Sequence, residues 1–340
     1  MSTATTSNSR IDRFMKNVRQ SLKEANYYEG HQELRAIASR LVKQKKHERA
    51  IQLLYLGALE LCQYHQWGSV ADLTTYMINI YIDEKMPVTV ESKERVYDIF
   101  EKLATATEYY PRVYETAIQW SIAADRQAGV AESVGDTQMH HFLGCILRSN
   151  ARYTDAEQHL LVGTPESPTV LGNMLFEWAS RTSCADYGLF AARGVLRYLA
   201  IGWYEAAASC WKAFAGRLAQ ALPDRVQERS EAVTKIGPVY HVQGHELANF
   251  VQLLLLAVER SDGKPSSQAA RVLAELRQQY VPLFGENAQT ASELIDAVAA
   301  KFFGVVVQKQ QSLFDIVNSL FAPPAPTNRA VTGPESMDLE

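Results

Sequence analysis

The chain has 340 residues, of which 47% are hydrophobic and 21% charged, an ordinary composition for a soluble globular protein. Its formal net charge of −4 argues against a nucleic-acid-binding domain, which is usually strongly basic. No apolar run approaches the roughly 20 residues that span a bilayer, and the N-terminus lacks the apolar region of a signal peptide. Four widely spaced cysteines within helical patterns indicate buried thiols in a reducing compartment, so we expect a cytoplasmic protein.

The chain opens on a polar segment, residues 1–9, which we expect to be disordered. Residues 10–25 carry apolar side chains at helical spacing, and a helical hairpin follows over Tyr27–Gln66. The two helices of this hairpin meet at His47-Glu48-Arg49-Ala50, a bulky ring, two polar residues and an alanine. A small residue in the first turn of the second helix lets two antiparallel helices approach closely.

The same junction pattern returns twice, at Tyr153–Ala156 and at Trp203–Ala206. Helical hairpins that cannot bury their apolar faces alone are typical of stacked helical repeats. The spacing between the three junctions is irregular, so these are not standard tetratricopeptide repeats.

Helical patterns of about 10–18 residues continue along most of the chain. They cover residues 70–81, 92–106, 111–128, 134–148, 153–161, 170–181, 186–200, 203–219, 245–260, 267–280, 288–303 and 310–321. The exception is a possible short β-hairpin near residues 231–243, with Gly237-Pro238 as its turn. The proline-rich tail, residues 322–340, is expected to be disordered. The pattern predicts an all-α fold, an α-solenoid of stacked helical hairpins similar to tetratricopeptide arrays.

Two motifs carry a resemblance to a known family: Tyr27-Tyr28-Glu29-Gly30-His31-Gln32 near the start, and Asn249-Phe250-Val251-Gln252 followed by four leucines. Over about residues 10–321 the chain resembles the scaffold subunit of the guided-entry-of-tail-anchored-proteins pathway, also called the Golgi-to-ER traffic scaffold family. The resemblance implies a solenoid without enzymatic activity, cofactor or metal. Gly30 stands where the family usually has alanine, and Pro238 would limit strand pairing in the hairpin.

The resemblance also implies partners. Members bridge a targeting ATPase and a ubiquitin-like adaptor subunit in the delivery of tail-anchored membrane proteins to the ER. The N-terminal half, residues 10–163, would dock the ATPase, and the C-terminal half, residues 164–321, would hold the adaptor with the hairpin as a clasp. Neither nucleic acid nor direct membrane insertion is implied.

A basic segment at the N-terminus is the first candidate site. Residues 10–50 contain eleven Lys and Arg against five Asp and Glu, in a chain that is acidic overall. This pattern favours an electrostatic docking face for an acidic partner, although the charges could simply solvate helices. With the resemblance, the candidate ATPase-docking residues are Lys16, Lys23, Tyr28, Glu29, His31, Gln32 and Arg35. One of Tyr27 and Tyr28 is expected to be a core ring.

The apolar helix at residues 245–260 is the second candidate site. Most of its leucines must belong to the core, because a helix that is apolar nearly all round must be covered nearly all round. The remaining face could form a groove for an amphipathic partner helix. The candidate residues for adaptor binding are Tyr240, Val242, Phe250 and Leu254.

Other functional classes find less support in the sequence. His241 and His245 would share a helix face with Glu246 nearby, but Gly244 and the absence of a convincing third ligand argue against a metal site. The sequence contains neither a phosphate-binding glycine motif nor an activated cysteine, so it gives no support to an all-α enzyme. The main alternative is a helical-repeat structural subunit of a large cytosolic assembly, such as a proteasome-lid-like complex.

Overall fold

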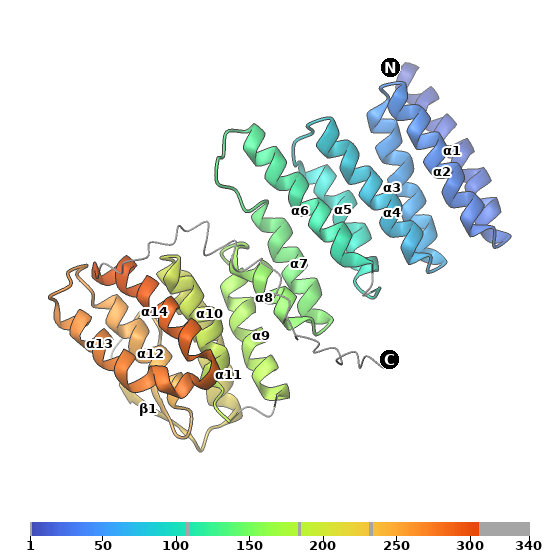
Figure 1. Ribbon diagram of the computed structural model, residues 1–340. Coiled ribbons are helices and arrows are strands. Elements are labelled where there is room, and N and C mark those ends of the chain that lie inside the picture. The colour runs from blue at the N-terminus through green and yellow to red at the C-terminus, as the bar shows by residue number, and fades with distance from the viewer. Residues whose placement is uncertain (1, 107–108, 183–184, 231–233, 306–340) are drawn as a thin grey trace, which may run out of the picture. The chain divides into compact units, whose positions relative to one another are not determined.

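The computed structural model describes residues 2–106, 109–182, 185–230 and 234–305, with side chains from Ile11 onward except that of Ser230. Within these residues almost every element is a helix, and one two-stranded antiparallel sheet interrupts the series (Figure 1). The prediction of an all-α solenoid is therefore confirmed. The elements are α1 (Ser2–Lys23), α2 (Tyr27–Lys43), α3 (His47–Gln63), α4 (Trp67–Asp83), α5 (Val90–Leu103), α6 (Tyr110–Gln127), α7 (Thr137–Ser149), α8 (Tyr153–Leu161), α9 (Ser167–Arg181), α10 (Gly188–Ala200), α11 (Tyr204–Ala221), β1 (Val226–Ser230), β2 (Val239–Val242), α12 (Glu246–Glu259), α13 (Gln268–Tyr280), the 3-10 helix η1 (Val281–Asn287) and α14 (Ala288–Phe303).

The helices pack both along the chain and across it. Consecutive helices such as α2 and α3, or α3 and α4, lie against each other. Alternate helices also pack together: α1 with α3, α3 with α5, α4 with α6, α7 with α9, α9 with α11, and α10 with α12. These helices therefore bury one face on a consecutive helix and another on the next helix of their own layer, which is how a solenoid builds a continuous core.

One hydrogen-bonded turn closes most helices of the N-terminal part. In the turn after α2, Lys45 N–H donates to Val42 O at 2.8 Å and Lys46 N–H donates to Leu41 O at 2.9 Å. This is the Schellman arrangement, which satisfies carbonyl groups left free at a helix end and needs a positive φ at its centre. The central residues of the first four such turns recur every 20 positions: Ala25, Lys45, His65 and Lys85. Helices of 17 residues with turns of three residues give this period in α2, α3 and α4.

The regular spacing of these turns cannot be recognised in the sequence, because their central residues are not glycines. A non-glycine residue at positive φ costs roughly 1–2 kcal/mol, so glycine is the usual choice and the usual sequence signal. Here that signal is absent from the first four turns and from the turn at Ala151, which has a φ of 56°. The 20-residue period of the first four turns therefore has no glycine signal in the sequence.

The ring that follows each turn closes the seam between helices, as the junction pattern suggests. Tyr27 opens α2 and contacts Tyr64, the residue that ends α3, with ring centroids 5.4 Å apart. His47 opens α3 and its Nδ1 lies 2.9 Å from a carboxylate oxygen of Glu84, which ends α4. The first residue of one helix therefore contacts the cap of the next in both repeats.

The third predicted junction is displaced by one residue. In the first two, the ring lies two positions and the buried alanine five positions after the turn residue. The turn residue of the third is Gly202, so the equivalent positions are Tyr204 and Ala207, which is fully buried. Trp203 is instead the turn residue's neighbour and is 48% exposed. The alignment on Trp203 and Ala206 is wrong because two aromatic residues stand side by side there.

The β-hairpin forms, but its first strand lies earlier than expected. Val226 pairs with Val242 and Glu228 with Tyr240, so the ladder starts before residue 231. Strand β1 reads Val-Gln-Glu-Arg-Ser, and its polar composition gives little strand signal. Pro238 directly precedes β2 and lies outside the ladder, so it does not limit pairing. Residues 231–233 lie outside the described part of the chain.

The start of the first helix differs from the sequence prediction. Helix α1 begins at Ser2, so residues 2–9 are helical where disorder is expected. Extending an existing helix needs no new nucleus, which is why a weakly helical sequence can follow it. Helix α8 packs on α9 across Gly163, where the N-terminal and C-terminal halves of the solenoid were expected to meet. The expectations for residues 310–340 fall outside the described residues.

Glycines allow some helix pairs to bring their backbones together. A methyl group on Gly172 of α9 would lie 2.1 Å from the carbonyl oxygen of Cys210 on α11. A methyl group on Gly188 of α10 would lie 1.9 Å from the backbone nitrogen of Ala248 on α12. Real atoms cannot approach this closely, so these positions admit only glycine without moving a helix.

This geometry predicts opposite effects for two glycine-to-alanine substitutions. Gly172→Ala should lower the free energy of unfolding by about 1–3 kcal/mol, because the helices must separate. Gly216→Ala on α11 should raise it by about 0.5–1 kcal/mol, because nothing lies within 4 Å of the added methyl group and alanine favours helix. Urea unfolding followed by circular dichroism measures both. Equal effects of the two substitutions would contradict the close packing of α9 on α11.

A pair of histidines joins α7 to α8. His140 Nε2 donates to the carbonyl of Val134 at 2.9 Å, so its Nδ1 accepts the hydrogen bond from His159 Nδ1, also at 2.9 Å. In this arrangement the His140 ring must be neutral, because a proton added to its Nδ1 would remove the acceptor. Burial lowers the pKa of His140, and burial together with the neighbouring ring lowers the pKa of His159 to about 3.

We expect the free energy of unfolding to fall on acidification. The folded state binds fewer protons than the unfolded state between pH 6.5, the ordinary histidine pKa, and about 3. Stability from this pair is therefore complete above pH 6.5 and decreases below it, on the order of 1 kcal/mol per pH unit. Urea midpoints measured from pH 7.5 to 4.5 test this, and His159→Gln should flatten the profile. An unchanged slope in that variant would show that other groups cause the acid sensitivity.

Candidate functional site

The predicted N-terminal docking residues lie on α1 and α2, and most are exposed. Lys16 and Lys23 project from α1, whose buried side is formed by Ile11, Met15, Val18 and Leu22. Within the described residues neither lysine forms an ion pair, so their charges are available to a partner. Glu29 and Gln32 of α2 are also exposed.

The two neighbouring tyrosines have different roles. Tyr27 is partly buried against Tyr64, as described above, and belongs to the seam between helices. Tyr28 is 75% exposed, the highest value among the large hydrophobic side chains of the described residues. Neither ring belongs to the core, although Tyr27 packs against Tyr64, and Tyr28 is the ring that can contact a partner.

His31 and Arg35 are tied to α4. Nε2 of His31 lies 2.9 Å from Asp72 Oδ2, and Arg35 donates to both carboxylate oxygens of Asp72 at 2.5 and 2.6 Å. The Arg35 guanidinium also lies 5.6 Å from the ring centroid of Tyr76. His31 is itself buried, so it positions this cluster more than it offers a contact. The cluster joins α2 and α4 and leaves Arg35 at the surface with part of its charge already balanced.

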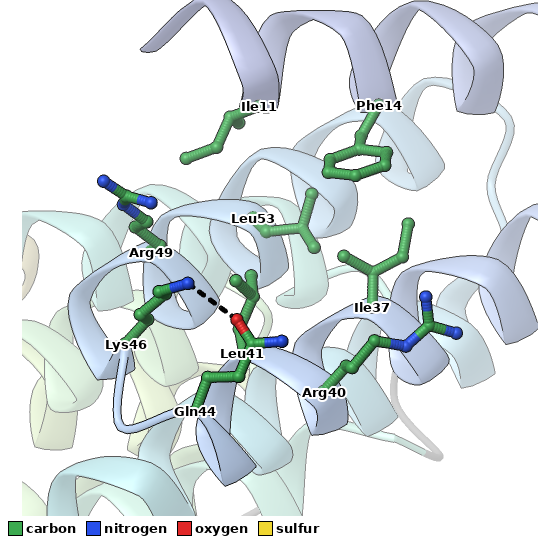
Figure 2. Close-up of a pocket in the computed structure, with 9 residues that line it drawn as sticks. All are labelled: Ile11, Phe14, Ile37, Arg40, Leu41, Gln44, Lys46, Arg49 and Leu53. Carbon is green, nitrogen blue, oxygen red and sulfur yellow. Dashed lines mark hydrogen bonds between the residues drawn. The ribbon is translucent and has the colours of Figure 1, made fainter. Parts of the chain in front are cut away.

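An apolar cavity with a basic rim opens beside this face, and the sequence patterns did not reveal it. Its volume is about 160 Å³, close to that of an engineered cavity of about 150 Å³ that accommodates a benzene ring. Figure 2 shows apolar side chains of α1, α2 and α3 turned toward a common space, with cations around it. The lining residues are Ile11, Phe14, Ile37, Arg40, Leu41, Gln44, Lys46, Arg49 and Leu53.

The rim of this cavity is positively charged and carries no acidic residue. Lys46 donates to Gln44 Oε1 at 2.7 Å, while Arg40 has no ion pair within the described residues (Figure 2). Lys46 belongs to the turn after α2, and Arg49 to the first turn of α3, so the fold gathers residues from a helix end, a turn and a helix start. We call this feature the N-terminal cavity. It suits one apolar side chain flanked by acidic residues.

The predicted adaptor-binding residues of the C-terminal half are mostly core residues. Phe250 and Leu254 are fully buried and Val242 nearly so, because α10, α11, α13 and β2 cover α12. These three side chains therefore do not line an open groove, and the prediction is wrong for them. Tyr240 is partly exposed and is the one member of the set that a partner could reach.

Two buried amides of α12 hold the hairpin on the helices. Gln252 accepts from Tyr240 N–H at 2.7 Å and donates to Tyr240 O at 2.5 Å. Asn249 accepts from Val242 N–H at 2.9 Å and donates to Val242 O at 3.1 Å. The two side chains therefore act as a third strand along the free edge of β2. This explains polar residues within the apolar motif Asn249–Leu256.

The histidines considered for a metal site lie on different elements. His241 is in β2 opposite Gln227, and His245 directly precedes α12. His245 Nδ1 accepts from Tyr187 N–H at 3.1 Å and lies 3.7 Å from Asp186. No group of three metal-ligating side chains occurs among the residues that the structure describes. In that same part of the chain, no helix is long and apolar enough to cross a membrane.

Comparison with known proteins extends over most of the chain. The family model for Golgi to ER traffic protein 4 matches residues 44–321. The chain belongs to this family.

Curated members of the Golgi to ER traffic protein 4 family match along almost their whole length. The protein of that name from Aspergillus fumigatus is 27% identical over 92% of this chain and 90% of its own length. The protein from Schizosaccharomyces pombe is 27% identical over 89% of this chain and 93% of its own. The crystal structure of C. therm. Get4 superposes with a TM-score of 0.74 at 24% identity, covering 96% of this chain and all of that one, and shows the same fold.

The family assignment favours a role in Golgi-to-ER traffic over the alternative of a helical-repeat structural subunit of a large cytosolic assembly. The matched region of the Golgi to ER traffic protein 4 model begins at residue 44, after the strip Tyr27–Arg35, whereas the curated relatives extend over about nine-tenths of the chain. The N-terminal cavity lies across this boundary, since its residues run from Ile11 to Leu53.

The amide contacts of α12 predict a specific effect of Gln252→Glu. A carboxylate still accepts from Tyr240 N–H but cannot donate to Tyr240 O, so one buried carbonyl loses its partner. We expect a loss of about 1–3 kcal/mol and faster amide exchange in β2, measured by hydrogen–deuterium exchange. Gln227→Glu, the same change at an exposed position of β1, is the matched control and should leave exchange unaltered. Similar exchange in both variants would mean that the hairpin does not depend on Gln252.

Proposed function

We propose that the chain is a non-catalytic scaffold that bridges a targeting ATPase and a ubiquitin-like subunit in the delivery of tail-anchored proteins to the ER. Membership of a family named for Golgi to ER traffic supports a role in that traffic. We place this function in the cytoplasm.

The observation that carries the proposal is the basic N-terminal face together with its cavity. Eleven cations against five anions over residues 10–50 attract an acidic partner and speed its association. The N-terminal cavity adds an apolar anchor point, and buried anchors at the centre of an interface supply most binding energy. Exposed Tyr28 lies on the same helix, α2, and offers a rigid aromatic contact.

The C-terminal half is proposed to hold the ubiquitin-like subunit. Of the residues first expected there, Tyr240 keeps an accessible side chain, and it lies on the hairpin strand that α12 fixes in place. A partner segment would therefore contact the outer side of the hairpin instead of Phe250 or Leu254.

Charge reversal tests the N-terminal assignment. The double variants Lys16→Glu/Lys23→Glu and Arg40→Glu/Lys46→Glu should each weaken binding of the targeting ATPase by about tenfold or more and reduce its salt dependence. The full-length chain and purified ATPase are used, with affinity measured by isothermal titration calorimetry from 50 to 300 mM salt. Binding of the ubiquitin-like subunit should be unchanged.

The control is Arg112→Glu near the start of α6, where an acidic residue suits the helix N-terminus and the fold is preserved. If this control weakens ATPase binding as much as the N-terminal variants, net charge and not a docking face determines affinity. If wild-type protein binds neither partner, the scaffold function is wrong.

A further inference from the structure

A second groove lies in the C-terminal part of the chain, between α10 on one side and η1 with α14 on the other. Its volume is about 270 Å³, larger than the cavity of about 150 Å³ that accommodates a benzene ring. The lining residues are Trp178, Thr182, Leu189, Phe190, Ala192, Arg193, Leu196, Arg197, Phe284, Asn287, Thr290, Ala291 and Leu294. We call it the α10–α14 groove. It is formed by other residues than the hairpin and the N-terminal cavity.

The floor of the α10–α14 groove is apolar, and two arginines, Arg193 and Arg197, also line the groove. Phe190, Leu196 and Phe284 are almost fully buried and form the floor. The guanidinium of Arg193 lies over the ring of Trp178, 4.8 Å from its centroid, which fixes its position. The α10 wall from Leu189 to Arg197 extends about 12 Å at 1.5 Å per residue, or about two helical turns.

The charge in this groove is not balanced. Glu157 of α8 is 1% exposed and bonds both arginines, with its oxygens 2.5 Å from Arg193 Nη2 and 2.8 Å from Arg197 Nη1. The single negative charge of Glu157 is therefore paired with two positive charges. None of the residues that line the groove is acidic. Uncompensated charge in a partly buried site is unfavourable and is relieved by a counter-charge. In keeping with this, burial lowers the pKa of Arg197 in spite of the adjacent Glu157.

The start of α14 adds to the positive potential. Asn287, Thr290 and Ala291 form part of the wall, so the first turn of this 16-residue helix borders the groove. No side chain caps this N-terminus. A helix N-terminus carries a partial positive charge and free N–H groups, which favours an anion close by.

We propose that the α10–α14 groove binds a short amphipathic segment of a partner protein, with apolar side chains on the floor and an acidic side chain at Arg193 and Arg197. Among the described residues, Glu157 accepts two hydrogen bonds from Arg193 and lies 2.8 Å from Nη1 of Arg197. Each guanidinium has five N–H groups, so most of these donors are left for an incoming carboxylate. An incoming carboxylate would balance the surplus charge and accept these donors. A purely apolar segment would cover the positive charge that Glu157 does not balance and would provide no counter-charge. The groove should therefore prefer a segment with an acidic side chain.

A matched pair of synthetic peptides tests this proposal on the full-length chain. Both peptides are amphipathic helices of 14 residues with capped ends and with leucine and phenylalanine on one face. They differ at one position in the centre of that face, where one peptide has glutamate and the other has glutamine. Fluorescence anisotropy should show binding of the glutamate peptide about five- to tenfold tighter, with the difference shrinking as salt rises. Equal affinities, or no binding by either peptide, would overturn the proposal.

Two substitutions at Thr290 locate the binding in the groove. Thr290 is exposed at the rim and its side chain does not contact Glu157, so neither change disturbs the buried ion pairs. Thr290→Glu should weaken binding of the glutamate peptide about fivefold, and Thr290→Lys should strengthen it by a similar factor. Circular dichroism checks that both variants keep the wild-type helix content. Affinities that do not respond to either substitution would place the peptide elsewhere and overturn the assignment.

The same variants distinguish a second copy of this chain from a foreign segment. Light scattering across a concentration series measures self-association directly. A dimer of the wild-type chain that dissociates in Thr290→Glu would show that a second copy occupies the groove, contrary to the proposal. The peptide test does not involve the ATPase or the ubiquitin-like subunit, so its failure leaves the scaffold function intact, and the reverse also holds.

Discussion

The hydrogen-bonded turn that ends the helices of the N-terminal part is the constraint on which the architecture depends. It accepts one residue at positive φ, closes two backbone hydrogen bonds and returns the chain after three residues. With helices of constant length it repeats every 20 residues, so each helix meets the next with the same register. The ring at the start of one helix can then reach the cap of the following helix, as Tyr27 reaches Tyr64 and His47 reaches Glu84. Strain at the turns, roughly 1–2 kcal/mol for each non-glycine residue, is offset by this packing.

The same turns decide which side chains reach the N-terminal surface. The turn at Lys45 places Lys46 beside Arg40 and Arg49, so cations from three local contexts surround one apolar cavity. The apolar lining and the cations of the N-terminal cavity have different proposed roles in binding. In the proposed interface the cavity would bury an apolar side chain, worth roughly 1.5–3 kcal/mol, and the cations would select and orient an acidic partner.

The C-terminal part uses buried polar groups to fix its geometry. Asn249 and Gln252 replace a missing strand along β2, and Glu157 holds two arginines of α10. Buried polar groups of this kind stabilise a structure when every member is satisfied. The amides are satisfied and close the hairpin on α12. The two arginines share the single carboxylate of Glu157, and the proposed binding of an acidic segment in the α10–α14 groove rests on that observation.

The sequence by itself determined the all-α class, the stacked hairpins, the basic character of residues 10–50 and the presence of one β-hairpin. It could do so because hydrophobic periodicity and charge are local properties. It did not determine the 20-residue period, since the turn residues are not glycines, nor the first strand, since its composition is polar. Phe250 and Leu254 were placed on a groove because the excess of apolar residues on α12 cannot show which neighbours cover them. Both cavities depend on residues that are far apart in the chain, from Ile11 to Leu53 and from Trp178 to Leu294. Only the packing of helices brings those side chains together, so the tertiary structure alone decided the two cavities at which we propose that partners bind.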